Sequence, residues 1–348
     1  MLAVTTADVE PSPPVTLWLL SDQVPFAQRL LIQAGTRCTR AGCPVKGQNV
    51  AASFGADPFD DLRAELASPT TGVFILLTTV GFGEGDTAIE DLQRIAAAAS
   101  GGHRVRVLTL DPIPERASDL ARVSGSMPSE AFPRLLGLPS NSLELRSGTE
   151  WLESLEGVRA ASLWCAAAGV ENTLAGVMAR LFDLLILTMG EPESIDAAFV
   201  LPRTGRALHA APGESLHSLS GCMALVARFG DGRAASLFGA EGWPKSGFSA
   251  KLVGSNGQMT LEDGVCTWFG GKGDTQRWGE PKHAGASEIG WSLERQIAAE
   301  IAEALSESSA VRPAPLETIL LMAQAALLSA RTGQPEALDT IRIMNGSR

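Results

Sequence analysis

The chain has 348 residues, a formal net charge of −11, and 45% hydrophobic against 19% charged residues. This composition is typical of a folded soluble protein, and the length exceeds what one hydrophobic core usually supports, so we expect two domains. The 28 Lys and Arg residues form no run or stripe that would neutralise phosphates, which argues against nucleic acid as a partner.

Five cysteines, an odd number, are spread from Cys38 to Cys266 without a CxxC pair or a Cys/His cluster. They predict neither a disulfide framework nor a metal site, and we expect reduced thiols in a cytoplasmic protein. Residues 1–14 lack the basic and apolar regions of a signal peptide and are expected to form a loose tail. No apolar run is long enough to predict a membrane span.

Residues 15–123 alternate between short apolar runs and helical patterns. The run VTLWLL at 15–20 is followed by the polar turn Ser21-Asp22-Gln23 and by a helical pattern with Pro25 in its first turn. Further strands are predicted at 36–40, 73–77 and 105–110, and further helices up to residue 54 and at 60–66, 87–99 and 115–123. Strands that alternate with helices predict an α/β domain with a Rossmann-like, doubly wound parallel sheet.

A long buried helix is predicted near the middle of the chain. Arg180 and Asp183 are its only charges, and their spacing of three residues makes them point the same way. They are either an ion pair at the rim of the core or part of a ligand site. Gly190 is expected to end this helix. The helix is indicated by apolar residues at helical spacing, namely Leu174, Val177, Met178, Leu181, Phe182 and Leu185.

Residues 124–348 are expected to form a second α/β domain with a mostly antiparallel, open sheet. Strands at 224–229 and 234–239 flank a Gly-Asp-Gly turn, and strands at 250–254 and 258–261 flank Asn256-Gly257, a strong hairpin signal. Helices are predicted from Ser292 and at 316–330. These helices can cover only one face of the sheet, so we expect the other face to pair two chains, as a homodimer or as a heterodimer with a homologue.

Four segments of the chain resemble the Gfo/Idh/MocA family, the group of glucose-fructose oxidoreductase and inositol dehydrogenase. They are FGADPFDDLRAELASPTTGVFILLT, LFDLLILTMGEPESIDA, KLVGSNGQMTLEDG and LMAQAALLSARTGQP. The resemblance spans residues 55–335 and implies a Rossmann domain followed by an α/β domain with an open sheet that is usually used for dimerisation. It also implies NAD(P)-dependent redox chemistry on a sugar, a cyclitol or a related small molecule, without a metal.

The first strand of the chain departs from that family. A dinucleotide site needs glycines after this strand, because a Cβ atom would block the approach of backbone N–H groups to the diphosphate. Here the turn holds Ser21 and Asp22, and the Asp carboxylate would repel phosphate. The remaining candidate cofactor contacts are Arg40, which would meet a 2′-phosphate, and Thr78 and Thr79, which follow the strand at 73–77. These residues therefore do not suit the binding of the NAD(P) cofactor that the resemblance implies.

The catalytic positions that the resemblance implies have also changed. Either Asp111 or Ile113 stands in place of the Lys of a Glu-Lys-Pro motif, depending on whether Pro112 or Pro114 matches its Pro. Arg180 stands in place of the catalytic His, with Asp183 kept three residues later. A guanidinium cannot take a proton from an alcohol near neutral pH. His209, His217 and His283 lie in loop-like surroundings, where an imidazole is most often solvated.

These residues favour a pseudoenzyme or binding subunit over the alternative, an active NAD(P)-dependent oxidoreductase that uses non-standard residues. Whether the chain is an enzyme stays open at this point. If Arg180 belongs to a surviving site, it should open onto the cleft between the domains, where it would hold a small anionic ligand by bidentate hydrogen bonds. Asp183 would then orient the guanidinium from behind.

Overall fold

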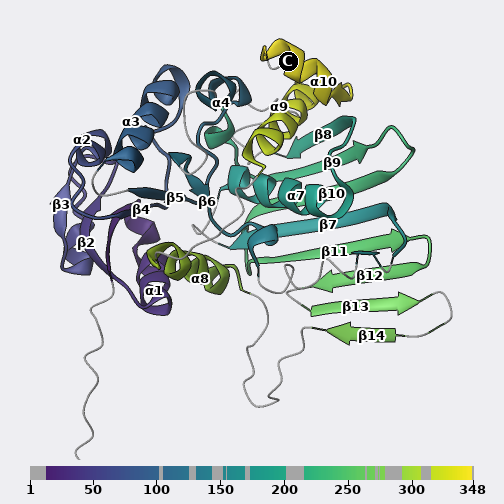
Figure 1. Cartoon of the computed structure of the whole chain (residues 1–348), viewed down its shortest axis with the longest axis horizontal. Coiled ribbons are helices and arrows are strands. Elements are labelled where there is room, and N and C mark those ends of the chain that lie inside the picture. Colours follow the sequence, from purple (N-terminus) through teal and green to yellow (C-terminus); the bar gives the residue numbers. More distant parts are fainter. Residues whose placement is uncertain are drawn as a thin grey trace, which may run out of the picture.

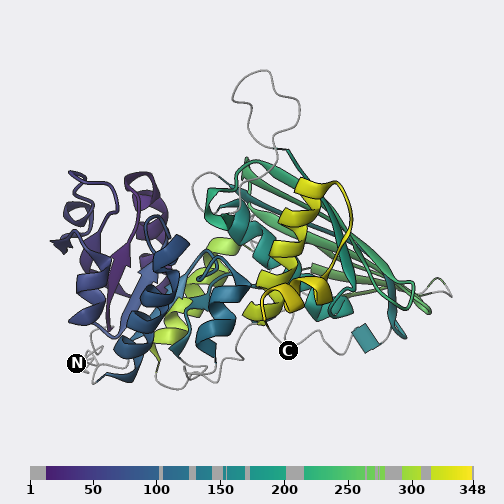
Figure 2. The same cartoon turned by 90° about the horizontal axis from the view of Figure 1, so that it is seen from above.

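A computed structural model describes residues 13–101, 105–124, 131–142, 152–153, 155–168, 173–200, 215–262, 265–270, 273, 275–278, 292–306 and 315–346. Most of the predicted N-terminal tail and two of the three histidines considered above, His209 and His283, lie outside these residues. The described chain builds two sheets that lie side by side, the first in purple to blue and the larger one in green (Figure 2).

The first sheet has six strands that are all parallel, in the order β3-β2-β1-β4-β5-β6 (Figure 1). Its central strands are short apolar runs, which suits a sheet that is covered on both faces. The strands are β1 (Pro14–Trp18), β2 (Arg37–Gly42), β3 (Asp57–Phe59), β4 (Val73–Leu76), β5 (Arg106–Thr109) and β6 (Arg134–Leu135).

Helices cover both faces of this sheet. Helix α1 (Val24–Ala34) packs on one face beside α8 (Leu293–Leu305), which comes from the second half of the chain. Helices α2 (Leu62–Ala67), α3 (Ala88–Ser100) and α4 (Ala117–Ser124) lie on the other face. The predicted doubly wound Rossmann-like sheet is therefore confirmed, whereas the boundary at residue 123 stays a prediction.

The second sheet has nine strands, in the order β14-β13-β12-β11-β7-β10-β9-β8-β15. Its neighbours are antiparallel except for β7 and β10, so the predicted mostly antiparallel sheet is confirmed. The strands are β7 (Val158–Ala168), β8 (Ser194–Val200), β9 (Cys222–Arg228), β10 (Ala234–Trp243), β11 (Gly247–Gly254), β12 (Gly257–Glu262), β13 (Val265–Gly270), β14 (Thr275–Trp278) and β15 (Glu336–Ala337).

Helices α7 (Leu174–Met189), α9 (Leu316–Thr332) and α10 (Leu338–Met344) form one core with the inward side chains of this sheet. Figure 1 shows α7 lying across β7 and β10. Helix α7 begins at Thr173, whose hydroxyl accepts a hydrogen bond from Gly176 N, and it ends at Gly190. It is apolar on all sides because the sheet and α9 enclose it.

Among the described residues, no helix has the length and apolar character to cross a bilayer. The sequence predictions missed β7, the central strand of the second sheet, because its segment VRAASLWCAAA is rich in Ala, which is not typical of strands. The helix expected up to residue 54 is a single 3-10 turn, Ala51–Phe54, and a short strand, β3, follows it.

Candidate functional site

The carboxyl ends of β1, β4 and β5 form the edge where doubly wound sheets bind ligands. Asp111 follows β5 there and lies against the start of α7, where its Oδ1 accepts a hydrogen bond from Thr173 Oγ1. The carboxyl is 2% exposed, and this burial raises its pKa, against opposing effects of His217 and Thr173. Asp111 therefore joins the two halves of the molecule at the predicted site.

The turn between β1 and α1 is closed by the side chain of Gln23. Its Oε1 accepts a hydrogen bond from Leu20 N at 2.9 Å, and its Nε2 donates to Leu77 O at 2.8 Å. Gln23 is 6% exposed, so its amide fills the space between the ends of β1 and β4. In a glycine-rich turn, backbone N–H groups at this place would face the diphosphate.

This turn does not fit a dinucleotide in the manner of a glycine-rich loop. The Leu20 N–H already donates to the Gln23 side chain. Asp22, the residue before Gln23, adds an exposed negative charge to the same turn. Ser21 is exposed as well. Asp22 lies in this turn as the sequence indicated, and so does Gln23, but the sequence did not indicate that the Gln23 side chain would close the turn.

Thr78 and Thr79 lie at the carboxyl end of β4 and are both buried. Thr78 Oγ1 accepts a hydrogen bond from Val80 N at 3.3 Å, and Thr79 O accepts one from Phe82 N. They shape the loop that follows β4, next to the carbonyl that Gln23 binds.

Arg40 lies within β2 and not at its end. Its Nε pairs with Glu65 Oε1 at 2.7 Å, and its guanidinium carbon lies 5.9 Å from the centre of the Phe59 ring. Both partners belong to the side of the sheet that carries α2. The structure therefore does not bring Arg40 together with Ser21 and Asp22.

Arg180 does not open onto a cleft, so that expectation is wrong. The side chain is 2% exposed, and its Nε donates to Gly137 O at 2.9 Å while Nη2 donates to Leu136 O at 3.4 Å. The guanidinium is held here because α7 lies against the segment that leaves the first sheet after β6. We call residues 136–141 the exit segment.

Asp183 binds the same exit segment one helical turn further along α7. Its two carboxylate oxygens accept hydrogen bonds from Ser140 N and Ser140 Oγ, each at 2.8 Å. Burial raises the pKa of Asp183 to about 6, although the bonds from Ser140 oppose the shift. The predicted role of Asp183 in orienting Arg180 is therefore not what the geometry shows, because Asp183 holds main chain and a hydroxyl.

Two side chains of α8 complete the enclosure of the exit segment. Gln296 Nε2 donates to Leu138 O at 2.5 Å and to Glu300 Oε1 at 3.0 Å. Glu300 Oε1 also accepts from Gly137 N at 3.2 Å. Burial raises the pKa of Glu300 to about 7, and the positive charges of Arg134 and Arg180 oppose this. Helices from opposite sides of the junction thus fix one short stretch of backbone.

Gly137 shows how tight this enclosure is. Its φ of +72° is in the left-handed region, and a Cβ atom there would lie 2.7 Å from Leu293 Cδ1 and 3.0 Å from Arg180 Nη2. The sequence analysis predicted no element and no contact for residues 136–141.

His217 is buried, contrary to the solvated position expected for it. It lies in the 3-10 turn η6 (Leu216–Ser218), and its side chain is 5% exposed. Its Nε2 bonds to Pro112 O at 2.8 Å, which places it beside Asp111. The proximity of His217 to Asp111 was not predicted from the sequence, because more than 100 residues separate them in the chain.

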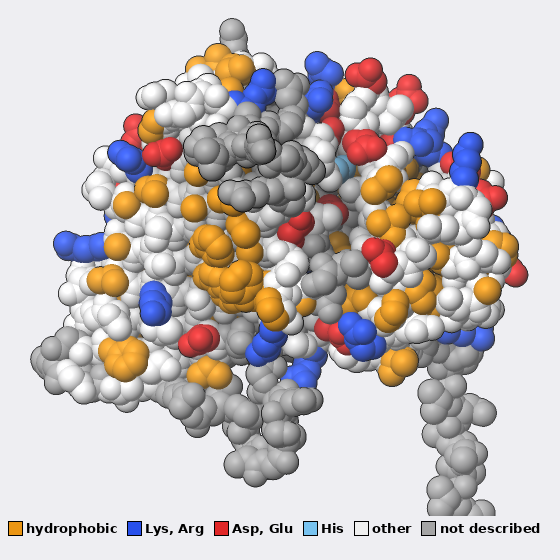
Figure 3. Space-filling model, turned by 180° about the vertical axis from the view of Figure 1, so that it is seen from behind, with side chains coloured by type: hydrophobic (Ala, Val, Ile, Leu, Met, Phe, Trp, Pro, Cys, Tyr) orange, Lys and Arg blue, Asp and Glu red, His pale blue; other side chains and the backbone are white. Residues whose placement is uncertain are grey.

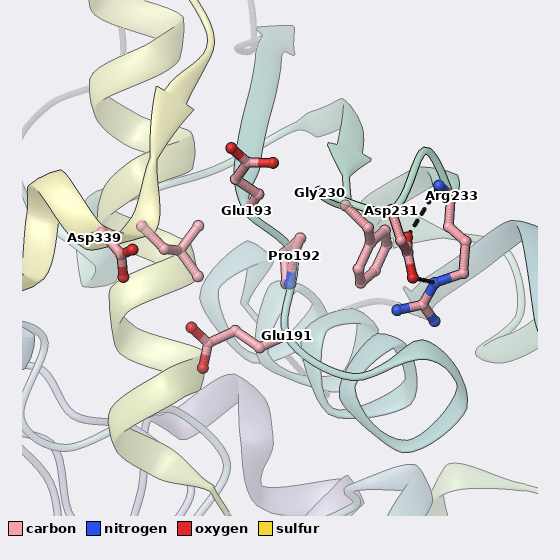
Figure 4. A pocket seen from close by; sticks show the side chains of 9 residues that line it. Glu191, Pro192, Glu193, Gly230, Asp231, Arg233 and Asp339 are labelled. Atoms are coloured by element: carbon pink, nitrogen blue, oxygen red, sulfur yellow. Dashed lines mark hydrogen bonds and ion pairs between the residues drawn. The ribbon is translucent and has the colours of Figure 1, made fainter.

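A separate pocket of about 310 Å³ lies at the far edge of the second sheet (Figure 4). It is lined by Glu191, Glu193, Asp231, Asp339 and Arg233, among others. Arg233 is engaged by Asp231 at 2.7 Å and by Met189 O at 2.9 Å. Among the described residues, no group of three or more His, Cys, Asp or Glu side chains is arranged to hold a metal ion.

The fold is shared with solved oxidoreductases across nearly the whole chain. Levoglucosan dehydrogenase, in complex with NADH and levoglucosan, has a TM-score of 0.68 at 11% identity, covering 94% of this chain and 99% of its own. An oxidoreductase from Agrobacterium radiobacter, in complex with NAD+, L-tartaric acid and magnesium, has a TM-score of 0.65 at 13% identity, covering 95% and 99%. GenD2 from gentamicin A biosynthesis, in complex with NAD, has a TM-score of 0.63 at 15% identity, covering 97% and 99%.

No family model matches the sequence, and no curated protein sequence matches it. At 11 to 15% identity the structural likeness shows the fold. The neighbours are oxidoreductases of the type that the sequence motifs resemble, so the predicted resemblance is confirmed at the level of the fold.

Proposed function

We propose that this chain is an oxidoreductase-like protein of the Gfo/Idh/MocA type that does not perform hydride transfer and acts as a binding subunit. In this proposal it lies in the cytoplasm, in keeping with the cysteines of the described chain, which are all free thiols. The observation that carries the proposal is the use of the two helix positions that the family resemblance makes catalytic. Arg180 and Asp183 are both buried and both hold the exit segment.

The closed turn at Gln23 supports the same proposal. We predict that NAD(H) and NADP(H) bind with dissociation constants weaker than about 1 mM, which corresponds to less than roughly 4 kcal/mol of binding free energy. The reason is that the Leu20 N–H is occupied and Asp22 repels phosphate. Isothermal calorimetry and nicotinamide fluorescence measure this, with levoglucosan dehydrogenase as a positive control. Saturable binding in the micromolar range would contradict the proposal.

The open face of the second sheet is the surface proposed for pairing. Figure 3 views the molecule from behind and shows hydrophobic side chains gathered over this sheet. Trp164 lies in register with Phe238, and its ring meets that of Trp243 edge to face at 6.5 Å. Phe238 and Trp243 are 36% and 45% exposed. Strands β7 to β13 have six to eleven residues each. At about 4.8 Å between strands and about 3.3 Å per residue they offer roughly 900 Å² per chain, which is within the range of a stable dimer.

A second copy of this chain is the partner we propose, with a homologous chain as the other outcome of the assembly experiment. Any small anionic ligand of the subunit must be held by cations other than Arg180, because that guanidinium is buried against main-chain carbonyls.

The alternative function is an NAD(P)-dependent oxidoreductase acting on a sugar, a cyclitol or a related molecule. One observation favours it: His217 lies next to Asp111 at the edge where such a fold binds ligands. Reduction of NAD(P)+ by a panel of polyols, abolished in a His217→Gln variant, would support this alternative. A rate equal to the uncatalysed background would support the binding subunit.

A further inference from the structure

The turn η6 bridges the two halves of the molecule. Leu216 and Leu219 are buried in the core of the second sheet, at 1% and 4% exposure. The polar side chains of the same turn reach the first half, because Ser215 Oγ donates to Glu115 and His217 Nε2 bonds to Pro112 O. Glu115 in turn accepts a hydrogen bond from Gly85 N at 3.0 Å. The turn is therefore anchored on one side by apolar packing and on the other by hydrogen bonds.

The tautomer of neutral His217 follows from its partner. A carbonyl oxygen only accepts hydrogen bonds, so Nε2 carries the hydrogen that is shared with Pro112 O. Nδ1 then presents a lone pair. This atom is buried and has no hydrogen-bond partner among the described residues, and it lies 3.8 Å from Glu84 Oε2. A lone pair that faces a carboxylate contributes no attraction, whereas an imidazolium N–H would.

The charged groups that face His217 from the elements around it are acidic. Glu84 lies in the loop before the 3-10 turn Gly85–Thr87, and Asp111 and Glu115 lie in the segment after β5. Burial raises the pKa of Asp111, whereas the positive charge of Arg180 on α7 opposes this shift. Glu241, at the end of β10, adds a further negative charge near Asp111. Protonation of His217 therefore places a cation beside the carboxyl groups of Glu84 and Asp111.

We propose that His217 is a proton-sensitive latch between the two halves, which gains an ion pair to Glu84 when the imidazole is protonated and keeps only the bond to Pro112 O when it is neutral. The latch closes the carboxyl end of β5 with the segment that contains η6. Protonation thus adds a second contact between the two halves, through Nδ1. This inference goes beyond the proposed function, since it holds for a binding subunit and for an enzyme alike.

A double-mutant cycle tests the latch. Glu84→Gln removes the negative charge but keeps a side-chain oxygen. That oxygen can still accept the hydrogen bond from Gly81 N, which Glu84 Oε1 accepts at 2.9 Å in the wild type. His217→Gln retains an amide donor for Pro112 O and removes the imidazole. Melting temperatures of the wild type, both single variants and the double variant are measured near pH 5.5 and near pH 8.5, about one unit below and two units above the ordinary imidazole value of about 6.5.

At the acidic pH we expect each single substitution to lower the melting temperature by about 2 °C, and the double substitution to lower it no further than one of them does. At the basic pH the interaction energy between the two positions, as the cycle measures it, should vanish. Coupling of the same size at both pH values, or none at the acidic pH, would overturn the proposal. Glu90→Gln, on the exposed surface of α3, is the matched control.

A second measurement needs no variant. Amide hydrogen exchange at Gly85 and Leu219, corrected for the intrinsic effect of pH, should slow at the acidic pH relative to the amides of β10. Equal protection at both pH values would count against the latch even if a variant fails to fold.

Discussion

Arg180 is the largest fully buried side chain among the residues that the structure describes, and its surroundings explain how the charge is kept there. At 2% exposure it donates to two carbonyls of the exit segment, and its positive charge opposes the rise that burial causes in the pKa of Asp111 and of Glu300. Removing a buried cation strongly destabilises the folded state, because the hydrogen-bond acceptors and acids around it are left unpaired.

We therefore predict that Arg180→Ala lowers the free energy of unfolding by about 3 kcal/mol, as measured by urea denaturation. Arg180→His should lose a similar amount, since an imidazole is too short to reach both carbonyls. Arg122→Ala is the control, because Arg122 is 68% exposed and should change stability by less than about 0.5 kcal/mol. Stability near that of the wild type in both Arg180 variants would mean that the guanidinium does not hold the exit segment.

Glu300 gives the second prediction at this scale. Its pKa rises from 4.5 to about 7 in the folded protein because the carboxyl is buried. The folded state then binds the proton more tightly than the unfolded state, so this group contributes stability below pH 4.5 that is lost as pH rises through about 7. Relative to Glu300→Gln, the wild type should lose on the order of 3 kcal/mol of stability across this window.

Urea denaturation of both proteins between about pH 4.5 and pH 8 measures this difference. Other titrating groups, such as Asp183, are common to the two proteins and cancel in the comparison. A difference that stays constant with pH, or one that grows as pH rises, would show that Glu300 is not a buried acid of raised pKa.

At the scale of elements, the approach of α7 to the second sheet depends on a glycine in β10. A Cβ atom at Gly239 would lie 3.0 Å from Val177 Cγ1 and 3.1 Å from Leu181 Cδ1, both on α7, and 2.7 Å from Met223 Cε on β9. These are the ends of side chains, which can move at some cost. The helix that carries Arg180 and Asp183 is thus seated directly on the sheet.

Gly239→Ala should destabilise the protein by about 1 to 3 kcal/mol, because the added methyl overpacks this contact. Ser236→Ala is the matched control, since Ser236 lies on the same strand but points to the open face. Thermal melting of both variants decides the point. Equal melting temperatures would indicate that α7 shifts freely over the sheet.

At the scale of the whole molecule, assembly follows from the open face of the second sheet. We predict that the wild type sediments as a dimer and that Phe238→Glu shifts it to monomer, because a carboxylate would be buried in an apolar interface. Ile32→Glu is the control, since Ile32 is 79% exposed on α1, far from this sheet. A wild type that sediments as a monomer at every concentration would contradict the proposed pairing.

Local patterns of the sequence predicted most of the elements. The helix from 174, the hairpin at Asn256-Gly257 and four strands of the first sheet, β1, β2, β4 and β5, were indicated by periodicity and turn residues, which act over a few neighbours. The short strands β3 and β6 were not predicted. The absence of glycine between residues 15 and 34 was also visible in the sequence. Strand β7 was missed because its burial between β10 and β11, and not its Ala-rich composition, makes it a strand.

The sequence by itself determined the two kinds of sheet, the unusual β1–α1 turn and the presence of two charges on an apolar helix. Only the tertiary structure decided what those charges contact, because the exit segment lies about 40 residues away in the chain. The same holds for Gln23, which binds Leu77 O, and for His217, which binds Pro112 O. Hydrogen bonds between distant residues leave no local pattern, since their geometry exists only after the two sheets have packed together.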